Sequence, residues 1–215
     1  MSFDNGPRIV TNGLVLALDA ADQNSYPGSG TTWTDLGGNN NNATLVNSPT
    51  FNSTNGGNLI FNGTNQYASF STYQQPAQSS TTSFTWNIWI FYIAGGLNPI
   101  LGNRFGGATW NKLTGVSFEY AGVQSFLVGG PTSNAWCNMS VVKNNTSFTL
   151  YRNSISISTA TNASSTAALP FYVGGDPGGE ISNCYISNVQ VYNRALSASE
   201  IQQNYNATKT RFGLT

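Results

Sequence analysis

Eight carboxylates and the absence of histidine limit the catalytic chemistry that this 215-residue sequence can support. Without an imidazole, a Ser-His-Asp triad, a Cys-His pair and a His-ligated zinc are excluded. Retaining glycoside hydrolysis needs only two carboxylates about 5 Å apart. No strand-like segment carries two of the eight acids, which are Asp4, Asp19, Asp22, Asp35, Glu119, Asp176, Glu180 and Glu200. We therefore expect a protein that is not an enzyme.

Aromatic and amide side chains offer binding chemistry instead. Aromatic faces stack on the C–H surfaces of sugars, and amides hydrogen-bond to hydroxyl groups. Trp110 and Asn111 follow two glycines in a segment with the composition of a loop, where binding residues concentrate. The candidate ligand-binding residues are Tyr67, Tyr73, Trp110, Asn111 and Asp176. Together they predict a glycan site at the loop ends.

The alternative for each aromatic side chain is that it packs in the core or in a turn. This is the interpretation that we favour for Trp33, Trp86 and Trp136, because they begin or occupy strands. For Trp110 the two interpretations stay open.

The two cysteines, Cys137 and Cys184, are too few for a disulfide framework. Each lies in an apolar run, so we expect buried free thiols. A single bridge between them remains the alternative if their strands are neighbours.

Charge is scarce in this chain. Charged residues make up 7%, against roughly 25% in an average domain. Eight basic residues cancel the eight acids, so no net field attracts nucleic acid or an anionic membrane. Low net charge favours association, which suits a homo-oligomer or a larger assembly. Residues 1–10 lack a basic stretch followed by an apolar one, so we expect no secretory signal.

Alternating apolar residues predict strands along most of the chain, and no linker divides it, so we expect one domain. The segment 84–93 is apolar on both faces, which is typical of a central strand covered on both sides or packed on a partner subunit. The expected strands are 14–19, 58–61, 66–70, 84–93, 100–105, 115–120, 123–128, 136–143, 147–152 and 154–158.

One helix is expected near the end of the chain. Ser197 and Glu200 have the spacing of a capping box, in which the hydroxyl and the carboxylate each accept a backbone N–H. Ile201, Asn204 and Tyr205 then share one face of a helix of about two turns.

Two long segments carry a family resemblance. Residues 13–70 include the turn FNGTNQY at 61–67, and residues 171–205 include ISNVQVYNRALS at 186–197. Together they resemble the opening and closing strands of the laminin G-like, concanavalin A-like lectin/glucanase domain. The resemblance implies an all-β jelly-roll sandwich of two antiparallel sheets with one short C-terminal helix. It implies a single domain over residues 1–215 with a core of about 13–205, closed by pairing of the first and last strands.

The family's domains are mostly binding modules for glycans or proteins. The opening LDAA at 18–21 and the loop SYPGSG at 25–30 are also similar to structural proteins of tailed bacteriophages. This likeness implies a virion protein, such as a capsid decoration, fibre or tail-associated protein, made in the host cytoplasm and bound to other virion proteins. A host-surface glycan is its candidate ligand. The alternative is a stand-alone carbohydrate-binding module without a virion role.

A calcium site is disfavoured by two departures from the family pattern. The family turn usually has Asp at the positions where this chain has Asn62 and Gln66, and calcium prefers several charged oxygens. We therefore expect no metal and no cofactor. A weak Ca²⁺ site would have to use the remaining acids of the loops, Asp19, Asp22, Asp176 and Glu180.

Overall fold

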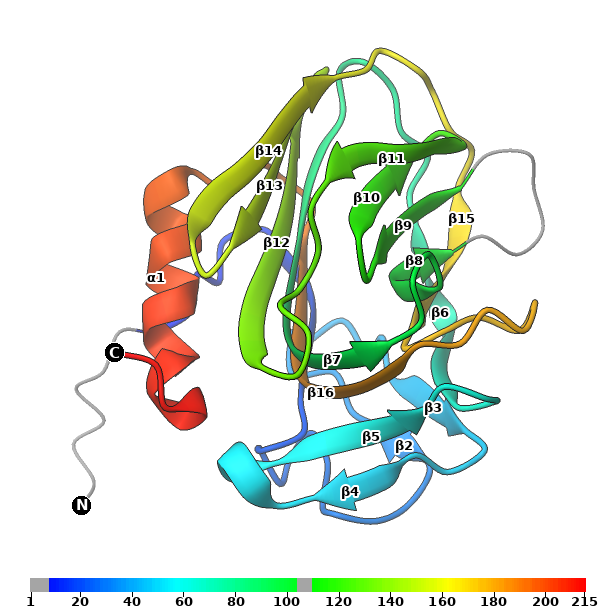
Figure 1. Cartoon of the computed structure of the whole chain (residues 1–215), viewed down its shortest axis with the longest axis vertical. Coiled ribbons are helices and arrows are strands. Elements are labelled where there is room, and N and C mark those ends of the chain that lie inside the picture. The colour runs from blue at the N-terminus through cyan, green and yellow to red at the C-terminus, as the bar shows by residue number, and fades with distance from the viewer. Residues whose placement is uncertain (1–7, 104–109) are drawn as a thin grey trace.

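The computed structural model describes residues 8–103 and 110–215, which form two packed antiparallel sheets (Figure 1). The strands of sheet A are β1 (Leu14–Asp19), β4 (Thr50–Asn52), β5 (Asn58–Asn62), β7 (Ser83–Ala94), β12 (Trp136–Asn144), β13 (Ser147–Arg152), β14 (Ile155–Thr161) and β16 (Asn183–Tyr192). Those of sheet B are β2 (Thr32–Trp33), β3 (Ala43–Val46), β6 (Tyr67–Gln75), β8 (Pro99–Asn103), β9 (Asn111–Thr114), β10 (Ser117–Tyr120), β11 (Val123–Val128) and β15 (Leu169–Val173). This confirms the all-β jelly-roll sandwich.

Sheet A has the order β14-β13-β12-β7-β16-β5-β4, and β1 also pairs with β16. Sheet B has the order β11-β10-β9-β8-β15-β6-β3-β2. The expected pairing of the first and last strands is confirmed, since Leu16 lies opposite Val191 and Leu18 opposite Val189. The expected strand 100–105 begins at Pro99, and its residues 104 and 105 lie outside the described part of the chain.

The core lies between the two sheets. The apolar residues of β7 alternate as expected, so that Trp86, Ile88 and Ile90 face sheet B and are fully buried. Trp33 is fully buried as well. The expectation for Trp136 is wrong in part, because this side chain lies on the outer face of sheet A, half-buried against Phe91. Within residues 8–103 and 110–215, both cysteines are buried free thiols.

The free edge of β1 is covered by the Asn-rich loop that follows β2. The carboxylate of Asp35 accepts hydrogen bonds from the backbone N–H groups of Ala17 (2.9 Å), Gly37 (2.7 Å) and Asn41 (3.1 Å). The amide of Asn41 donates to the Val15 carbonyl at 2.9 Å. The loop thus replaces a neighbouring strand and satisfies an edge that would otherwise be open to another chain.

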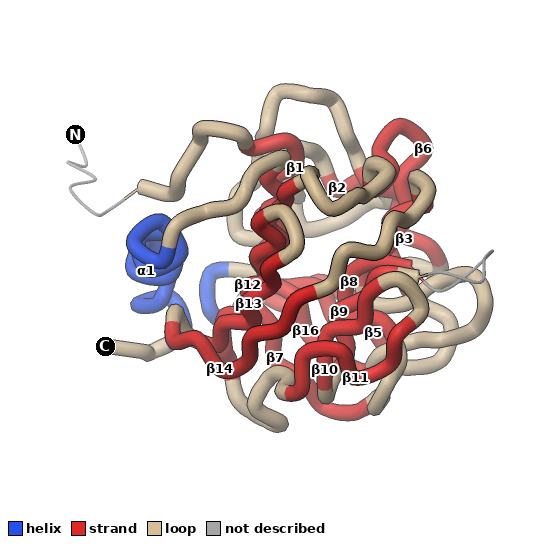
Figure 2. Tube along the Cα trace, turned by 90° about the horizontal axis from the view of Figure 1, so that it is seen from above, coloured by secondary structure: helices blue, strands red, loops and turns tan. Residues whose placement is uncertain are grey.

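The helix α1 (Ala198–Thr208) packs on the outer face of sheet A (Figure 2). The capping box of Ser197 and Glu200 is confirmed. The helix has eleven residues rather than two turns, and the short 3₁₀ helices η1 (Thr54–Gly56) and η2 (Lys209–Phe212) complete the described elements. The added length places Tyr205 and Phe212 against Trp89, with ring centroids 5.6 and 4.0 Å away. Among the described helices, none is long and apolar enough to cross a membrane.

Removing the carboxylate of Asp35 should destabilise the domain. Asp35→Ala leaves three backbone N–H groups without their acceptor, which costs about 2–4 kcal/mol of the free energy of unfolding. Urea unfolding followed by circular dichroism measures this loss. The matched control is Asp22→Ala, because Asp22 bonds only within its own exposed turn at Asn24. Equal stability of the two variants would contradict the role given to Asp35.

Stability should fall at alkaline pH and stay nearly level from about pH 5 to 8, where no histidine titrates. Burial raises the pKa of Cys137 to about 11 and those of Tyr120 and Tyr192 to about 12. Above about pH 9 the unfolded chain loses these protons while the folded chain keeps them, so the free energy of unfolding decreases. Lys143, whose pKa burial lowers, acts in the opposite direction but is one group against several. Urea unfolding at pH 7, 9 and 10.5 tests this, and higher stability at pH 10.5 would contradict it.

Candidate functional site

A row of residues crosses the outer face of sheet B, the face turned away from sheet A. Glu119 on β10 lies opposite Lys112 on β9, which lies opposite Gly102 on β8. Gly102 lies opposite Tyr172 on β15, and Tyr172 lies opposite Ser69 on β6. Because cross-strand partners on one face are in contact, five strands contribute to one surface, which we call the sheet B face.

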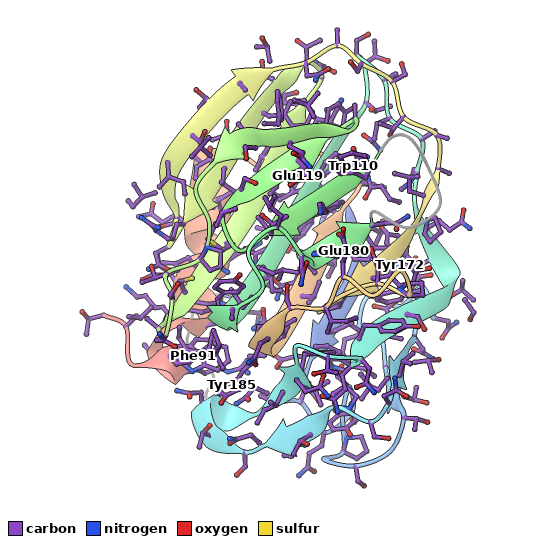
Figure 3. The ribbon with its side chains drawn as sticks, turned by 45° about the vertical axis from the view of Figure 1, so that its right-hand side comes forward. Phe91, Trp110, Glu119, Tyr172, Glu180 and Tyr185 are labelled. Carbon is purple, nitrogen blue, oxygen red and sulfur yellow. The ribbon has the colours of Figure 1, made fainter. Side chains whose placement is uncertain are left out.

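The ammonium of Lys112 joins two carboxylates on the sheet B face. It lies 3.1 Å from Glu180 Oε2 and 3.7 Å from Glu119 Oε2, and it donates to the Leu97 carbonyl at 2.6 Å. The Lys112 and Glu119 side chains are almost completely buried, whereas that of Glu180 is 25% exposed. Figure 3 shows Glu119 on its strand and Glu180 on the loop after β15. The ion cluster therefore fastens this loop to the sheet.

Trp110 is held beside the cluster by its indole nitrogen. Its Nε1–H donates a 2.6 Å hydrogen bond to Glu119 Oε2, and the ring remains half-buried (Figure 3). The other carboxylate oxygen, Glu119 Oε1, is buried and has no hydrogen-bond partner among residues 8–103 and 110–215. The site thus combines a fixed aromatic ring with a carboxylate that has an unused acceptor.

Two tyrosines form the other side of the sheet B face. The half-buried rings of Tyr67 and Tyr172 meet edge to face, with centroids 5.9 Å apart and planes at 85°. Burial raises the pKa of Tyr172, and the charges of Tyr67 and Asp176 add to the effect, so its hydroxyl stays a neutral donor. This pair provides a second aromatic surface.

No side chain stands between Lys112 and Tyr172, because the residue between them is Gly102. Its φ of +101° suits glycine, and a Cβ there would lie 2.1 Å from the Asn111 carbonyl oxygen. Gly102 is itself buried, so the strands pack closely here and the half-buried aromatic rings lie on either side of it.

Three of the five predicted ligand-binding residues lie at the sheet B face. Tyr67 and Trp110 are half-buried on it. Asp176 is in the adjoining loop but is 1% exposed, and its Oδ1 accepts the Gly178 N–H at 2.9 Å. Asp176 therefore shapes the loop that carries Glu180.

The other two do not have the exposed positions expected of them. Tyr73 is 7% exposed and packs edge to face on Phe171, because an irregularity in the pairing of β6 with β15, between Ser69 and Gln74, breaks the alternation and turns it toward the core. Asn111 is 1% exposed, donating to Thr166 Oγ1 at 3.2 Å and accepting the Ala121 N–H at 3.0 Å. It points away from Trp110 since neighbours on a strand face opposite sides.

Sequence reasoning missed Lys112, Glu119, Tyr172 and Glu180 as members of the site. A lone charge in an apolar strand was the available signal for Lys112 and Glu119. Their pairing depends on the register of β9 with β10, which no local pattern specifies.

The acids of the loops named as weak calcium candidates include two with partners within the protein. No group of three or more His, Cys, Asp or Glu residues that could hold a metal ion occurs in the part of the chain that the structure describes. Asp19 pairs with Arg211 at 2.8 Å, and Asp22 bonds to Asn24. These two carboxylates therefore stabilise their own loops.

A second aromatic surface lies on the outer face of sheet A, and we call it the sheet A stripe. Trp136, Phe91, Tyr185 and Ile60 are successive cross-strand neighbours, and all are half-buried. Phe91 and Tyr185 stack with centroids 5.3 Å apart (Figure 3). This surface is apolar, and its four members carry no charged group.

The family model of the concanavalin A-like lectin/glucanases superfamily, of the laminin G-like type, matches residues 62–202. The chain belongs to this family. No curated protein matches the sequence. Membership agrees with the resemblance of the terminal segments and with the jelly roll.

Solved structures share the fold at low sequence identity. A Trypanosoma rangeli sialidase in complex with sialic acid has a TM-score of 0.68 and 20% identity over 93% of this chain. Domain 4 of AbnA, a Geobacillus stearothermophilus arabinanase, in complex with arabinotriose, has a TM-score of 0.67 and 14% identity, over 89% of this chain and 98% of that domain. The binding domain of Paraclostridial Mosquitocidal Protein 1 has a TM-score of 0.63 and 17% identity, over 91% of this chain and 52% of that one. This chain spans 33% of the sialidase, so the likeness concerns the fold alone.

Removing the Lys112 ammonium should destabilise the protein strongly. Lys112→Met leaves the Glu119 carboxylate buried without its cation, which costs about 3–5 kcal/mol. Adding Glu119→Gln should recover part of this loss, because the neutral amide does not need a cation. Urea unfolding of the single and double variants measures both terms.

The control is Lys209→Met in η2, for which we expect less than about 1 kcal/mol. A Lys112→Met variant as stable as this control, or a double variant no more stable than Lys112→Met, would contradict the role of the buried cluster.

Proposed function

We propose that this protein binds carbohydrate on the sheet B face and catalyses no reaction. The observation that carries the proposal is the placement of three half-buried aromatic rings on one face of the sheet, with Trp110 on one side of Gly102 and Tyr67 and Tyr172 on the other. Partly exposed aromatic rings on one face suit a sugar ring, whose C–H surfaces stack on them.

Polar groups for sugar hydroxyls lie within the same surface. Glu119 Oε1 is a buried acceptor without a partner among the described residues, and the Glu180 side chain is partly exposed. Glu180 is the carboxylate that a ligand hydroxyl can reach, and a hydroxyl that donates to it gains a charge-assisted hydrogen bond. Lys112 orients both carboxylates, which keeps them in place before a ligand arrives.

The absence of catalysis is part of the proposal. A hydrolase needs one carboxyl group to protonate the leaving oxygen and a second to attack or to activate water. Glu119 and Glu180 instead share the Lys112 ammonium, and Glu119 is also bound to Trp110. The arabinanase domain in complex with arabinotriose supports sugar binding by this fold without adding evidence for catalysis.

A structural role in a virion is the second candidate, and the sheet A stripe favours it. Three neighbouring half-buried aromatic residues on a flat sheet, Trp136, Phe91 and Tyr185, are typical of the centre of a protein interface. We propose that this stripe packs on another subunit or virion protein, so that the sheet B face remains available for a host glycan. The likeness of residues 18–30 to phage structural proteins supports this setting and a location in the virion.

Glycan-array binding followed by titration calorimetry tests the first candidate. Trp110→Ala and Tyr172→Ala should each weaken binding roughly tenfold, because each removes one stacking surface. Tyr185→Ala on the sheet A stripe is the matched control and should bind as the unchanged protein does.

Two results would overturn this assignment. One is equal weakening by Tyr185→Ala, which would move the ligand to the sheet A stripe. The other is no binding to any glycan together with self-association that Tyr185→Ala abolishes in light scattering, which would favour the structural candidate.

A further inference from the structure

A cavity of about 620 Å³ opens between the two sheets at the end of the sandwich, away from the sheet B face. β1 and β16 form its sheet A side, and the end of β6 with the connection to β7 forms its sheet B side. Its apolar wall consists of Val15, Tyr73, Phe84 and Val191. We call it the end cavity.

Most polar side chains around the end cavity already have partners. Gln75 Oε1 accepts the Trp86 indole N–H at 3.0 Å. The Gln78 amide donates to the Pro76 carbonyl at 2.8 Å and accepts the Thr82 hydroxyl at 2.9 Å. These groups line the walls but have little capacity left for a charged ligand.

The one charge at the rim, Arg194, is neutralised as well. Its guanidinium forms a two-point ion pair with Glu200, at 2.5 and 2.9 Å, and donates to the Asn12 carbonyl at 2.9 Å. A ligand with a net charge would find no free counter-ion among the lining residues, all of which the structure describes. The wall therefore favours an uncharged occupant.

The Tyr73 hydroxyl differs from the other polar groups around the end cavity. Its side chain is 7% exposed, and its hydroxyl makes no hydrogen bond within residues 8–103 and 110–215. This hydroxyl is not one of the fully buried unpaired polar atoms of the described residues, so a ligand in the cavity can reach it and form a hydrogen bond with it. This is an anchor point at the wall of the cavity.

We propose that the end cavity binds a neutral, largely apolar small molecule that has one hydrogen-bonding group for the Tyr73 hydroxyl. The volume lies within the roughly 300–1,000 Å³ typical of small-molecule sites. Tyr73 follows Tyr67 by six residues on β6, about 20 Å along the strand, so this site is separate from the sheet B face. The ligand is distinct from a glycan, whose many hydroxyl groups would find few partners here.

N-phenyl-1-naphthylamine, a neutral aromatic amine that becomes fluorescent in apolar surroundings, is the probe for this site. The unchanged protein should bind it saturably. Val15→Trp should fill the cavity and weaken binding at least tenfold, and Tyr73→Phe should weaken it about threefold by removing the hydroxyl. The matched control is Val128→Trp on β11, because Val128 is 68% exposed and β11 is an edge strand of sheet B, separated by four strands from the β6 wall of the cavity.

A second variant covers the case in which Val15→Trp fails to fold, as judged by circular dichroism. Thr81→Trp alters an exposed residue at the cavity lining and should weaken binding in a folded protein. The proposal is overturned if the unchanged protein shows no saturable binding. It is also overturned if the folded cavity variants bind the probe as tightly as Val128→Trp.

Discussion

Strand β16 holds sheet A together. It pairs with β7 along most of its length, with β5 over its first residues and with β1 over its last. These partners come from distant parts of the sequence, so sheet A closes only when β16 is in place. A one-residue slip of β16 would exchange Tyr185, on the outer face, with Cys184 in the core. The same strand anchors the loop after β15 that presents Glu180 to Lys112.

Because this chain has few charged residues, amide groups and a few buried charged groups make the polar contacts that surface charges make in other domains. Amide and hydroxyl groups form a buried network under α1, in which Asn87 donates to Gln190 and accepts from Ser140. Lys143 is buried at the end of the sandwich, where its ammonium donates to three backbone carbonyls. Leaving such groups unpaired is costly, which explains their dense hydrogen bonding.

Local patterns predicted ten of the sixteen described strands and the capping box, and the family resemblance implied the pairing of the terminal strands. They could not predict which side chains meet across a sheet, because that depends on register between distant segments. Tyr67 and Trp110 were identified by type and position, whereas Lys112 and Tyr172 become site residues only through Gly102 between them. Tyr73 was expected at the site but lies on the core side of the sheet, because a register shift between β6 and β15 breaks the alternation that would have placed it beside Tyr67.

The central claim is that ligand binding takes place at the sheet B face beside Trp110. The most direct test is a titration of the protein with a glycan that it binds on the array. Nuclear magnetic resonance follows the indole N–H signals of the five tryptophans during the titration. We expect the Trp110 signal to shift, because its N–H bonds to Glu119 within the site, and we expect the signals of Trp86 and Trp89 to stay unchanged. A shift confined to Trp136, on the sheet A stripe, would contradict it.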